Sequence, residues 1–181
     1  MKTLRIVNII ASTKIFGDID IELLSEKIKN CQYEPGLFSG LIYRKKTYTI
    51  IMFSTGKISS HGSKSEKQAK EAIVDTLNEI ENLGAIIGRK EFDNIRIENV
   101  VGVGEIELDK SLEEIIPYFS NVIYETEQFP GLIYKPHNNS ITCLIFNSGK
   151  VVIVGSKSEK QTYEIYIELI DKINKINKND C

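Results

Sequence analysis

The sequence contains few of the residues that usually build catalytic or metal-binding sites. Its 181 residues include three cysteines, Cys31, Cys143 and Cys181, and two histidines, His61 and His137. No two cysteines form a C-x-x-C pair, so the spacing supports neither a zinc cluster nor a disulfide framework, and free thiols are expected. Neither histidine has a nucleophile or a carboxylate pair placed with it in a catalytic pattern. The sequence therefore predicts no enzyme, no metal ion and no cofactor.

Long hydrophobic runs are also absent. No stretch approaches the roughly 20 apolar residues that span a membrane, and the amino terminus lacks a charged segment followed by an apolar one. The chain nevertheless has 41% hydrophobic residues, which suffices for a substantial core. We expect a compact, soluble protein inside the cell that has no membrane contact.

Charge of one sign does not dominate either. The 23 lysines and arginines are balanced by 25 aspartates and glutamates, which gives a formal net charge of −2. Proteins that bind nucleic acids usually present a basic surface, because counterion release drives their affinity. The overall balance does not indicate such a partner, but it says little about any single face.

Internal repetition is the most informative property of the chain. The segment GSKSEKQ occurs unchanged at residues 62–68 and 155–161, and each copy follows an F-x-x-G-K sequence. A period near 90 residues is too long for a solenoid repeat. It indicates two fused half-domains, each with a sheet layer and a helix layer. We predict repeats at residues 1–91 and 92–181 that share one compact body.

Hydrophobic periodicity gives the same order of elements in both halves, β-α-β-β-β-β-α, and predicts an α+β fold. Ser65 and Gln68 have the spacing of a capping box and mark the start of a long helix. The expected helices are residues 20–30, 65–83, 109–119 and 158–176. The expected strands are residues 4–12, 40–45, 48–54, 57–62 and 95–103, with further strands through residue 154.

Several predicted strands are apolar on both faces, for example residues 50–53 and 151–154. Two helices per half are enough to cover one face of a sheet, which leaves the other face apolar and exposed. Such a face usually marks a binding surface. Two other interpretations fit the same pattern: the face packs against a partner subunit, or the two halves stack into a closed sandwich.

The duplication also relates four phenylalanines. Phe38 and Phe129 each precede the start of a strand, and Phe53 and Phe146 each close the next one. An aromatic side chain at these places is suited equally to filling the core and to acting as a wedge.

At this point the motifs resemble a known family. Y-E-x-E-Q-F-P-G-L-I-Y at residues 124–134, I-F-N-S-G-K at residues 145–150 and the repeated G-S-K-S-E are similar to those of the TATA-box-binding proteins in their archaeal form. The resemblance extends from about residue 3 to residue 176. It implies a pseudo-twofold saddle with a curved antiparallel sheet, whose concave side sits on the DNA minor groove and whose convex side carries the helices.

The resemblance further implies a general transcription initiation factor that binds an A·T-rich box, and it assigns roles to residues. Phe38, Phe53, Phe129 and Phe146 would kink the DNA. The minor-groove contacts would be Asn8, Ile10, Ile51, Ser59, His61, Asn99, Val101, Leu144, Val152 and Val154, with Ser39 and Pro130 lining the groove. Arg44, Lys57, Lys64, Lys135, Lys150 and Lys157 would contact phosphates.

One departure from the family pattern lies in the first half. Ser59 and His61 stand where the second half has Val152 and Val154, and the family usually has an apolar residue at the first position and threonine or valine at the second. Either the first half makes a more polar contact, or His61 serves as a donor to an A·T pair.

The resemblance implies protein partners as well. Glu125, Glu127 and Gln128 would bind transcription factor B, which brings in RNA polymerase indirectly, and the free protein would be able to form a homodimer. The implied location is the cytoplasm of an archaeal cell, on the nucleoid. An alternative function is an accessory binding module of a nucleic-acid enzyme, or a small-ligand cavity between sheet and helices.

Overall fold

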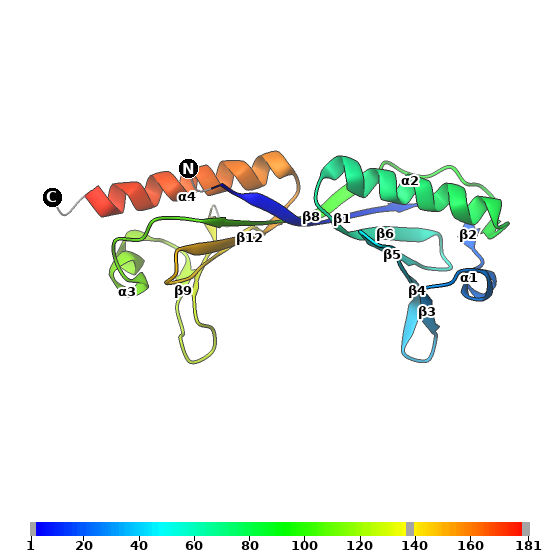
Figure 1. The fold of residues 1–181 in the computed structure, drawn as a ribbon, viewed down its shortest axis with the longest axis horizontal. Coiled ribbons are helices and arrows are strands. Elements are labelled where there is room, and N and C mark those ends of the chain that lie inside the picture. The colour runs from blue at the N-terminus through cyan, green and yellow to red at the C-terminus, as the bar shows by residue number, and fades with distance from the viewer. Residues whose placement is uncertain (1–2, 137–139, 179–181) are drawn as a thin grey trace. The chain divides into compact units, whose positions relative to one another are not determined.

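The structure is a computed structural model that describes residues 3–136 and 140–178. The chain divides into two compact units (Figure 1). The first unit is Asn8–Glu98, and the second runs from Asn99 onward and also includes residues 3–7. The boundary predicted between residues 91 and 92 concerns the sequence repeats and stays a prediction.

The first unit holds a five-stranded antiparallel arrangement in the order β3-β4-β5-β6-β1, and its longer helix is α2. A separate two-stranded sheet pairs β2 with β7. The elements are β1 (Arg5–Lys14, of which residues 8–14 belong here), β2 (Asp18–Ile19), α1 (Ile21–Lys27), β3 (Cys31–Glu34), β4 (Phe38–Arg44), β5 (Thr49–Met52), β6 (Lys57–Ser63), α2 (Glu66–Asn82) and β7 (Ile86–Ile87).

The second unit repeats this arrangement in the order β8-β12-β11-β10-β9. Its elements are β8 (Arg96–Glu105), α3 (Leu112–Ile115), the 3-10 helix η1 (Ile116–Tyr118), β9 (Val122–Ile123), β10 (Leu132–Tyr134), β11 (Thr142–Ile145), β12 (Lys150–Ser156) and α4 (Glu159–Lys178). Apart from β2 and β7, the predicted order β-α-β-β-β-β-α is confirmed in both copies.

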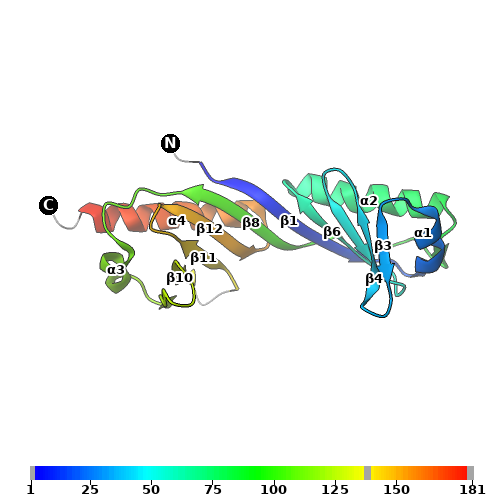
Figure 2. The same cartoon turned by 60° about the horizontal axis from the view of Figure 1, so that its bottom comes forward.

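One long helix covers one face of the strands in each unit. In Figure 1, α2 lies on one side of β5 and β6, while the β3–β4 hairpin projects away from it. Figure 2 shows β12, β11 and β10 side by side with α4 behind them. Ile73, Leu77 and Ile80 of α2 are buried against the sheet. The main part of each core therefore lies between the long helix and one face of the strands, and Leu112 and Ile115 of α3 add to the core of the second unit.

Helices α2 and α3 each begin directly after an N-cap serine. The Ser65 hydroxyl accepts a hydrogen bond from the Gln68 backbone N–H at 3.2 Å, so the predicted start of α2 is confirmed. The helix predicted over residues 109–119 is wrong in extent, because α3 starts only at the Ser111 capping box and is followed by a 3-10 turn. Pro117 causes this change, since it has no N–H to continue the α-helical bonds.

Candidate nucleic-acid interface

Side chains on the strands alternate between a covered and an uncovered face in the first unit. Ile58 and Ser60 of β6 are fully buried under α2, and the Ser60 hydroxyl donates to the Ala69 carbonyl of that helix at 3.0 Å. Ser59 and His61 alternate with them along the strand and are only partly buried, so they point to the opposite face. We call this uncovered surface the first-repeat face. Its predicted members are Asn8, Ile10, Ile51, Ser59 and His61.

Cross-strand pairing brings these residues together. Ile51 of β5 lies opposite Ser59 of β6, and Thr49 lies opposite His61. On its other side, Ser59 lies opposite Ser12 of β1. Thr49 and Ser12 were not predicted as site residues, although the period of two along each strand could have identified them.

The second unit has an equivalent surface, which we call the second-repeat face. Its predicted members are Asn99, Val101, Leu144, Val152 and Val154, all partly buried. Leu144 lies opposite Val152, which in turn lies opposite Val103 of β8. Val151 and Ile153, which alternate with them, are fully buried. Apart from Asn99 and Thr142, which lies opposite Val154, this face is aliphatic, whereas the first-repeat face has more hydroxyl groups and an imidazole.

A duplicated backbone distortion fixes the asparagine side chain on each face. Gly62 has a φ of +97°, and the β1–β6 register shifts beside it, which is the geometry of a bulge. The freed Gly62 N–H donates to Oδ1 of Asn8 at 2.8 Å. Gly155, with a φ of +94°, donates to Oδ1 of Asn99 at the same distance.

This contact leaves each asparagine with only donors to offer. Because an N–H must meet an acceptor, the amide oxygen of Asn8 or Asn99 faces the bulge and the NH₂ group is left over. Neither amide nitrogen has a partner among the described residues. The arrangement therefore presents two N–H donors and no acceptor from each asparagine.

The four related phenylalanines form two pairs with the same ring separation. The ring centroids of Phe38 and Phe53 are 5.6 Å apart and the rings meet edge to face. Phe129 and Phe146 have the same centroid separation, with an interplanar angle of 58°. Phe38 is 40% exposed, so it does not fill the core. Each pair is available to act on a partner.

A glycine lies beneath each aromatic pair. A Cβ atom on Gly40 would lie 2.7 Å from the Phe38 ring and 3.0 Å from the Phe53 ring. A Cβ on Gly131 would lie 3.0 Å from Phe129 and 3.2 Å from Phe146. The rings therefore rest directly on the strand backbone. Ser39 and Pro130, the predicted groove-lining residues, are exposed next to them.

All six predicted phosphate-binding residues are exposed. Lys57 and Lys150 begin β6 and β12, right after the turns that follow Phe53 and Phe146. Lys57 lies opposite Lys14, whereas Lys150 lies opposite Glu105. The positive charge is therefore denser at this edge of the first unit, and Lys14 is a candidate contact that the sequence did not reveal.

The remaining basic residues lie close to the same surfaces. Lys64 and Lys157 follow the two bulges, and their backbone N–H groups donate to Gln68 and Gln161. Arg44 ends β4, where its guanidinium donates to the side chain of Gln32 at 3.2 Å. The sixth predicted residue is Lys135, just after β10.

The predicted partner-binding residues lie in one turn of the second unit. The backbone N–H groups of Gln128 and Phe129 both donate to the Glu125 carbonyl at 2.9 Å. Glu125, Glu127 and Gln128 are all exposed. The turn therefore holds Phe129 in place and presents two carboxylates and an amide to solvent.

His61 is the titratable residue among the five predicted members of the first-repeat face. Its Nε2 lies 3.0 Å from the Ser59 hydroxyl oxygen, and partial burial lowers the pKa of the imidazole. Near neutral pH the ring is therefore uncharged, with one nitrogen as a donor and the other as an acceptor.

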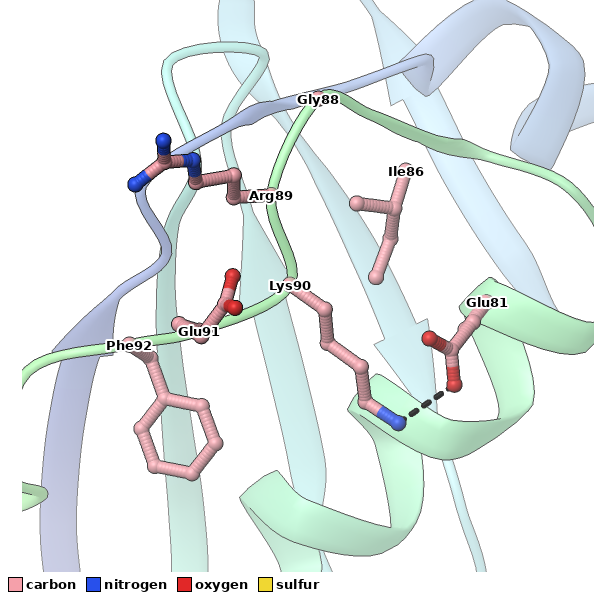
Figure 3. A pocket seen from close by; sticks show the side chains of 7 residues that line it. All are labelled: Glu81, Ile86, Gly88, Arg89, Lys90, Glu91 and Phe92. Atoms are coloured by element: carbon pink, nitrogen blue, oxygen red, sulfur yellow. Dashed lines mark hydrogen bonds and ion pairs between the residues drawn. The ribbon is translucent and has the colours of Figure 1, made fainter.

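Nothing in the described residues suggests catalysis. The pocket in Figure 3 is a shallow hollow beside the chain between α2 and β8, where the Lys90 ammonium pairs with the Glu81 carboxylate. Burial raises the pKa of the Cys143 thiol to about 12, so it is no nucleophile. Within residues 3–136 and 140–178, no group of histidine, cysteine and acidic side chains could hold a metal ion, and no helix could cross a membrane. His137 and Cys181 lie outside the described residues.

Comparison with known proteins identifies relatives along almost the whole chain. The family described as "Transcription factor TFIID (or TATA-binding protein, TBP)" matches residues 3–83 and 94–176. The TATA-box-binding protein of Methanocaldococcus jannaschii is 35% identical over 175 residues, covering 96% of this chain and 94% of that one. That of Pyrobaculum aerophilum is 34% identical, over 95% of this chain and 86% of its own length. The solved structure "Methanococcus jannaschii TBP" superimposes with a TM-score of 0.81 at 34% identity, and covers 95% of this chain and 98% of that structure.

Proposed function

Because this chain belongs to the TATA-binding protein family, we propose that it is a general transcription initiation factor that binds the minor groove of an A·T-rich promoter box. It is a DNA-binding protein and not an enzyme. The observation that supports this best is the asparagine that offers only hydrogen-bond donors, which occurs once on each face that no helix covers.

The chemistry of the two faces suits the minor groove of A·T base pairs. That groove offers the acceptors adenine N3 and thymine O2, whereas a G·C pair adds the donor N2 of guanine. The NH₂ groups of Asn8 and Asn99 can donate to the acceptors, and aliphatic side chains such as Val101 and Leu144 can pack on sugars and base edges. Against valine or leucine, a guanine amino group would lose its hydrogen bond to water and gain none.

The phenylalanine pairs supply the means to bend DNA. Minor-groove proteins, of which TATA-binding proteins are a standard example, insert apolar side chains between base steps and kink the duplex. We propose that Phe38 and Phe53 open one step of the box, and that Phe129 and Phe146 open another. Ser39 and Pro130 would line the groove beside them.

The basic residues complete the contact with the DNA backbone. Lys57, Lys64, Lys150 and Lys157 begin or follow strands whose side chains form the two faces. Together with Arg44 and Lys135 they would neutralise phosphates at the rim of the groove. The net charge of −2 then reflects acidic residues elsewhere on the chain.

The exposed turn at Glu125, Glu127 and Gln128 would bind transcription factor B, and RNA polymerase would join through that factor. Before DNA binds, the apolar faces would be available for pairing between two copies of the chain. The site of action would be the chromosomal DNA in the cytoplasm of an archaeal cell.

DNA bending provides the test of this function. We would label the two ends of a short duplex carrying a TATA-like box and measure energy transfer between them with and without protein. The wild type is expected to shorten the end-to-end distance on this duplex and not on a G·C-substituted one. The Phe129→Ala, Phe146→Ala variant should lose the shortening.

The control variant is Phe16→Ala, since Phe16 is 63% exposed and belongs to neither phenylalanine pair. It should bend the duplex as the wild type does. Absence of wild-type binding to either duplex would overturn the proposed function. Unchanged bending by the double variant would overturn the role of the wedges alone.

A further inference from the structure

The first-repeat and second-repeat faces differ in hydrogen-bonding capacity at two equivalent places. Ser59 and His61 of β6 correspond, at the repeat offset of 93, to Val152 and Val154 of β12. Both pairs occupy the uncovered face, and on one side their neighbours match, since Ser59 lies opposite Ile51 and Val152 lies opposite Leu144. On the other side the difference continues, because Ser59 lies opposite Ser12 and Val152 lies opposite Val103. The two repeats therefore share the backbone arrangement at these positions but differ in the hydrogen-bonding capacity of the side chains.

The side chains of Ser59 and His61 are hydrogen bonded to each other. The Ser59 hydroxyl oxygen lies 3.0 Å from His61 Nε2, and neither side chain has another partner among the described residues. Because burial keeps the imidazole neutral near pH 7, one hydrogen atom lies between the two groups and either group can supply it.

The position of that hydrogen atom determines which donor and which acceptor the pair presents to the groove. When His61 Nε2–H donates to Ser59, the serine O–H is free to donate to a third group and Nδ1 is an acceptor. When the serine O–H donates to Nε2, the serine oxygen keeps its lone pairs for accepting and Nδ1–H becomes a donor. The pair can therefore meet either an acceptor or a donor in the groove.

Guanine N2 is the one donor that the minor groove contains. Facing Val152 and Val154 it would lose its hydrogen bond to water without replacement. Facing Ser59 and His61 it would find a serine oxygen or an imidazole nitrogen to accept its hydrogen. An adenine or thymine acceptor would be satisfied by the same two residues after the hydrogen is placed the other way.

We propose that Ser59 and His61 allow the first-repeat face to accept a G·C base pair, whereas Val152 and Val154 keep the second-repeat face selective for A·T. This inference rests on the proposed minor-groove binding. The protein would then recognise boxes whose halves differ in composition, and a G·C pair in one half would place the first repeat there.

Affinity on three sets of duplexes tests the idea. The first duplex has an all-A·T box, the second set has one G·C pair placed at each position of one half in turn, and the third has G·C at the matching position of both halves. Since the two repeats have equivalent folds, we expect the protein to bind its site in either direction, so the wild type can bring the first-repeat face to a single G·C pair. When both halves carry a G·C pair, one of the two pairs must face the second repeat.

At the most favourable single G·C position, the affinity of the wild type should fall by less than about threefold. When both halves carry G·C, one pair must face the second repeat, and the affinity should fall by about tenfold or more, which is the usual cost of one mismatched base pair. Ser59→Val, His61→Val copies the second repeat and should lose about tenfold with the first G·C pair. Val152→Ser, Val154→His copies the first repeat and should tolerate G·C in both halves.

Each variant is built from residues that already occur at the equivalent place in this chain, and its affinity for the all-A·T box reports whether it is folded. If the wild type binds and bends the all-A·T duplex but loses as much with a single G·C pair as Ser59→Val, His61→Val does, the inference is overturned while the proposed function stands. If Ser59→Val, His61→Val does not fold, Val152→Ser, Val154→His provides the test. The inference is overturned if that variant binds the duplex with G·C in both halves no better than the wild type does. Failure of the wild type to bind any duplex overturns the proposed function itself.

Discussion

Asn8 and Asn99 show how a backbone distortion determines what a side chain can offer to a partner. In each unit a glycine with positive φ frees an N–H group, and the asparagine oxygen accepts from it. An asparagine has both donor and acceptor, but here the acceptor is already occupied. The residue type alone therefore does not explain what the side chain presents, because the bulge occupies the amide oxygen and leaves only the NH₂ group.

Asn99→Asp separates these two roles. The aspartate oxygen would still accept from the Gly155 N–H, so thermal stability should change little. The donor is lost and a negative charge faces the DNA, so affinity for the box should fall by at least about tenfold. Asn99→Ala provides the contrast, since it also leaves the Gly155 N–H unpaired and should cost about 1 kcal/mol of unfolding free energy. Wild-type affinity in Asn99→Asp would show that the amide does not donate to the bases.

His61 predicts how stability depends on pH. Burial lowers the pKa of its imidazole in the folded state below the unfolded value of about 6.5. The associated stability is therefore fully present above the unfolded pKa and is lost as the pH falls through the folded pKa. Ser12, Thr49 and Ile51, on the strands beside Ser59 and His61, do not titrate, and Glu98 is hydrogen bonded to Ser12.

We expect the melting temperature of the wild type to fall more between pH 7.5 and pH 5 than that of His61→Val. The two proteins share all their other titrating groups, so the comparison isolates His61. Thermal unfolding followed by circular dichroism measures both. Parallel pH dependence in the two proteins would contradict the prediction.

At the scale of elements, strand β4 supports an aromatic pair because it contains glycine where any side chain would collide. The Cβ of an alanine at position 40 would lie 2.7 Å from the Phe38 ring and 3.0 Å from the Phe53 ring. Since both rings are side-chain ends on a sheet surface, they can shift and the strand need not. The strand is then expected to fold with these two rings displaced.

Gly40→Ala is accordingly expected to reduce DNA bending strongly and stability by no more than about 1–3 kcal/mol, the cost of overpacking. Energy transfer across the labelled duplex measures the first, and denaturant unfolding the second. Gly36→Ala in the neighbouring hairpin is the matched control, because its Cβ would meet nothing within 4 Å. Equal bending by the two variants would argue against a role for the glycine.

Some elements were predictable and others were not, for physical reasons. The start of α2 follows from the Ser65 cap, and α4 from its long amphipathic repeat. Strand β3, with the sequence CQYE, lacks an apolar alternation and exists through pairing with β4, so the sequence gives it no local signal. β9 consists of Val122 and Ile123 alone and depends in the same way on β10.

At the scale of the whole molecule, the positions of the charged residues say more about binding than the net charge does. The chain has a net charge of −2, yet Lys14 and Lys57 lie opposite each other at the edge of the first unit. Two adjacent like charges repel, so this arrangement is costly for the free protein. A phosphate placed there would remove the repulsion.

Salt dependence tests this use of charge. Lys57→Gln should reduce the slope of log affinity against log salt concentration by about 1, the value for one phosphate contact. Lys67→Gln is the control, because Lys67 is an exposed residue of α2, the helix on the opposite side of the strands. Titrations of the box at several salt concentrations give both slopes. An unchanged slope for Lys57→Gln would remove this lysine from the phosphate contacts.

Much of the candidate site was predictable because the duplication makes each half a check on the other. Positions such as Ile51 and Leu144 follow from alternation along a strand, and the structure places them on the uncovered faces. The bulge contacts of Asn8 and Asn99 and the position of Lys14 were not predictable, since they depend on which residues of different strands lie opposite each other. Their roles in DNA binding stay predictions.

Leu4 has a consequence for the order in which the protein folds. It is buried among core residues of the second unit that come from as far along the chain as Ile176, and the Tyr163 hydroxyl donates to its carbonyl across 159 residues at 3.5 Å. During synthesis Leu4 is made before the whole of the first unit, but its neighbours on α4 are made last. The first unit can therefore fold while the chain is still growing, whereas the second must close a very long loop and is expected to fold slowly. A fragment that begins at residue 92 would lack Leu4 and would carry an unfilled core.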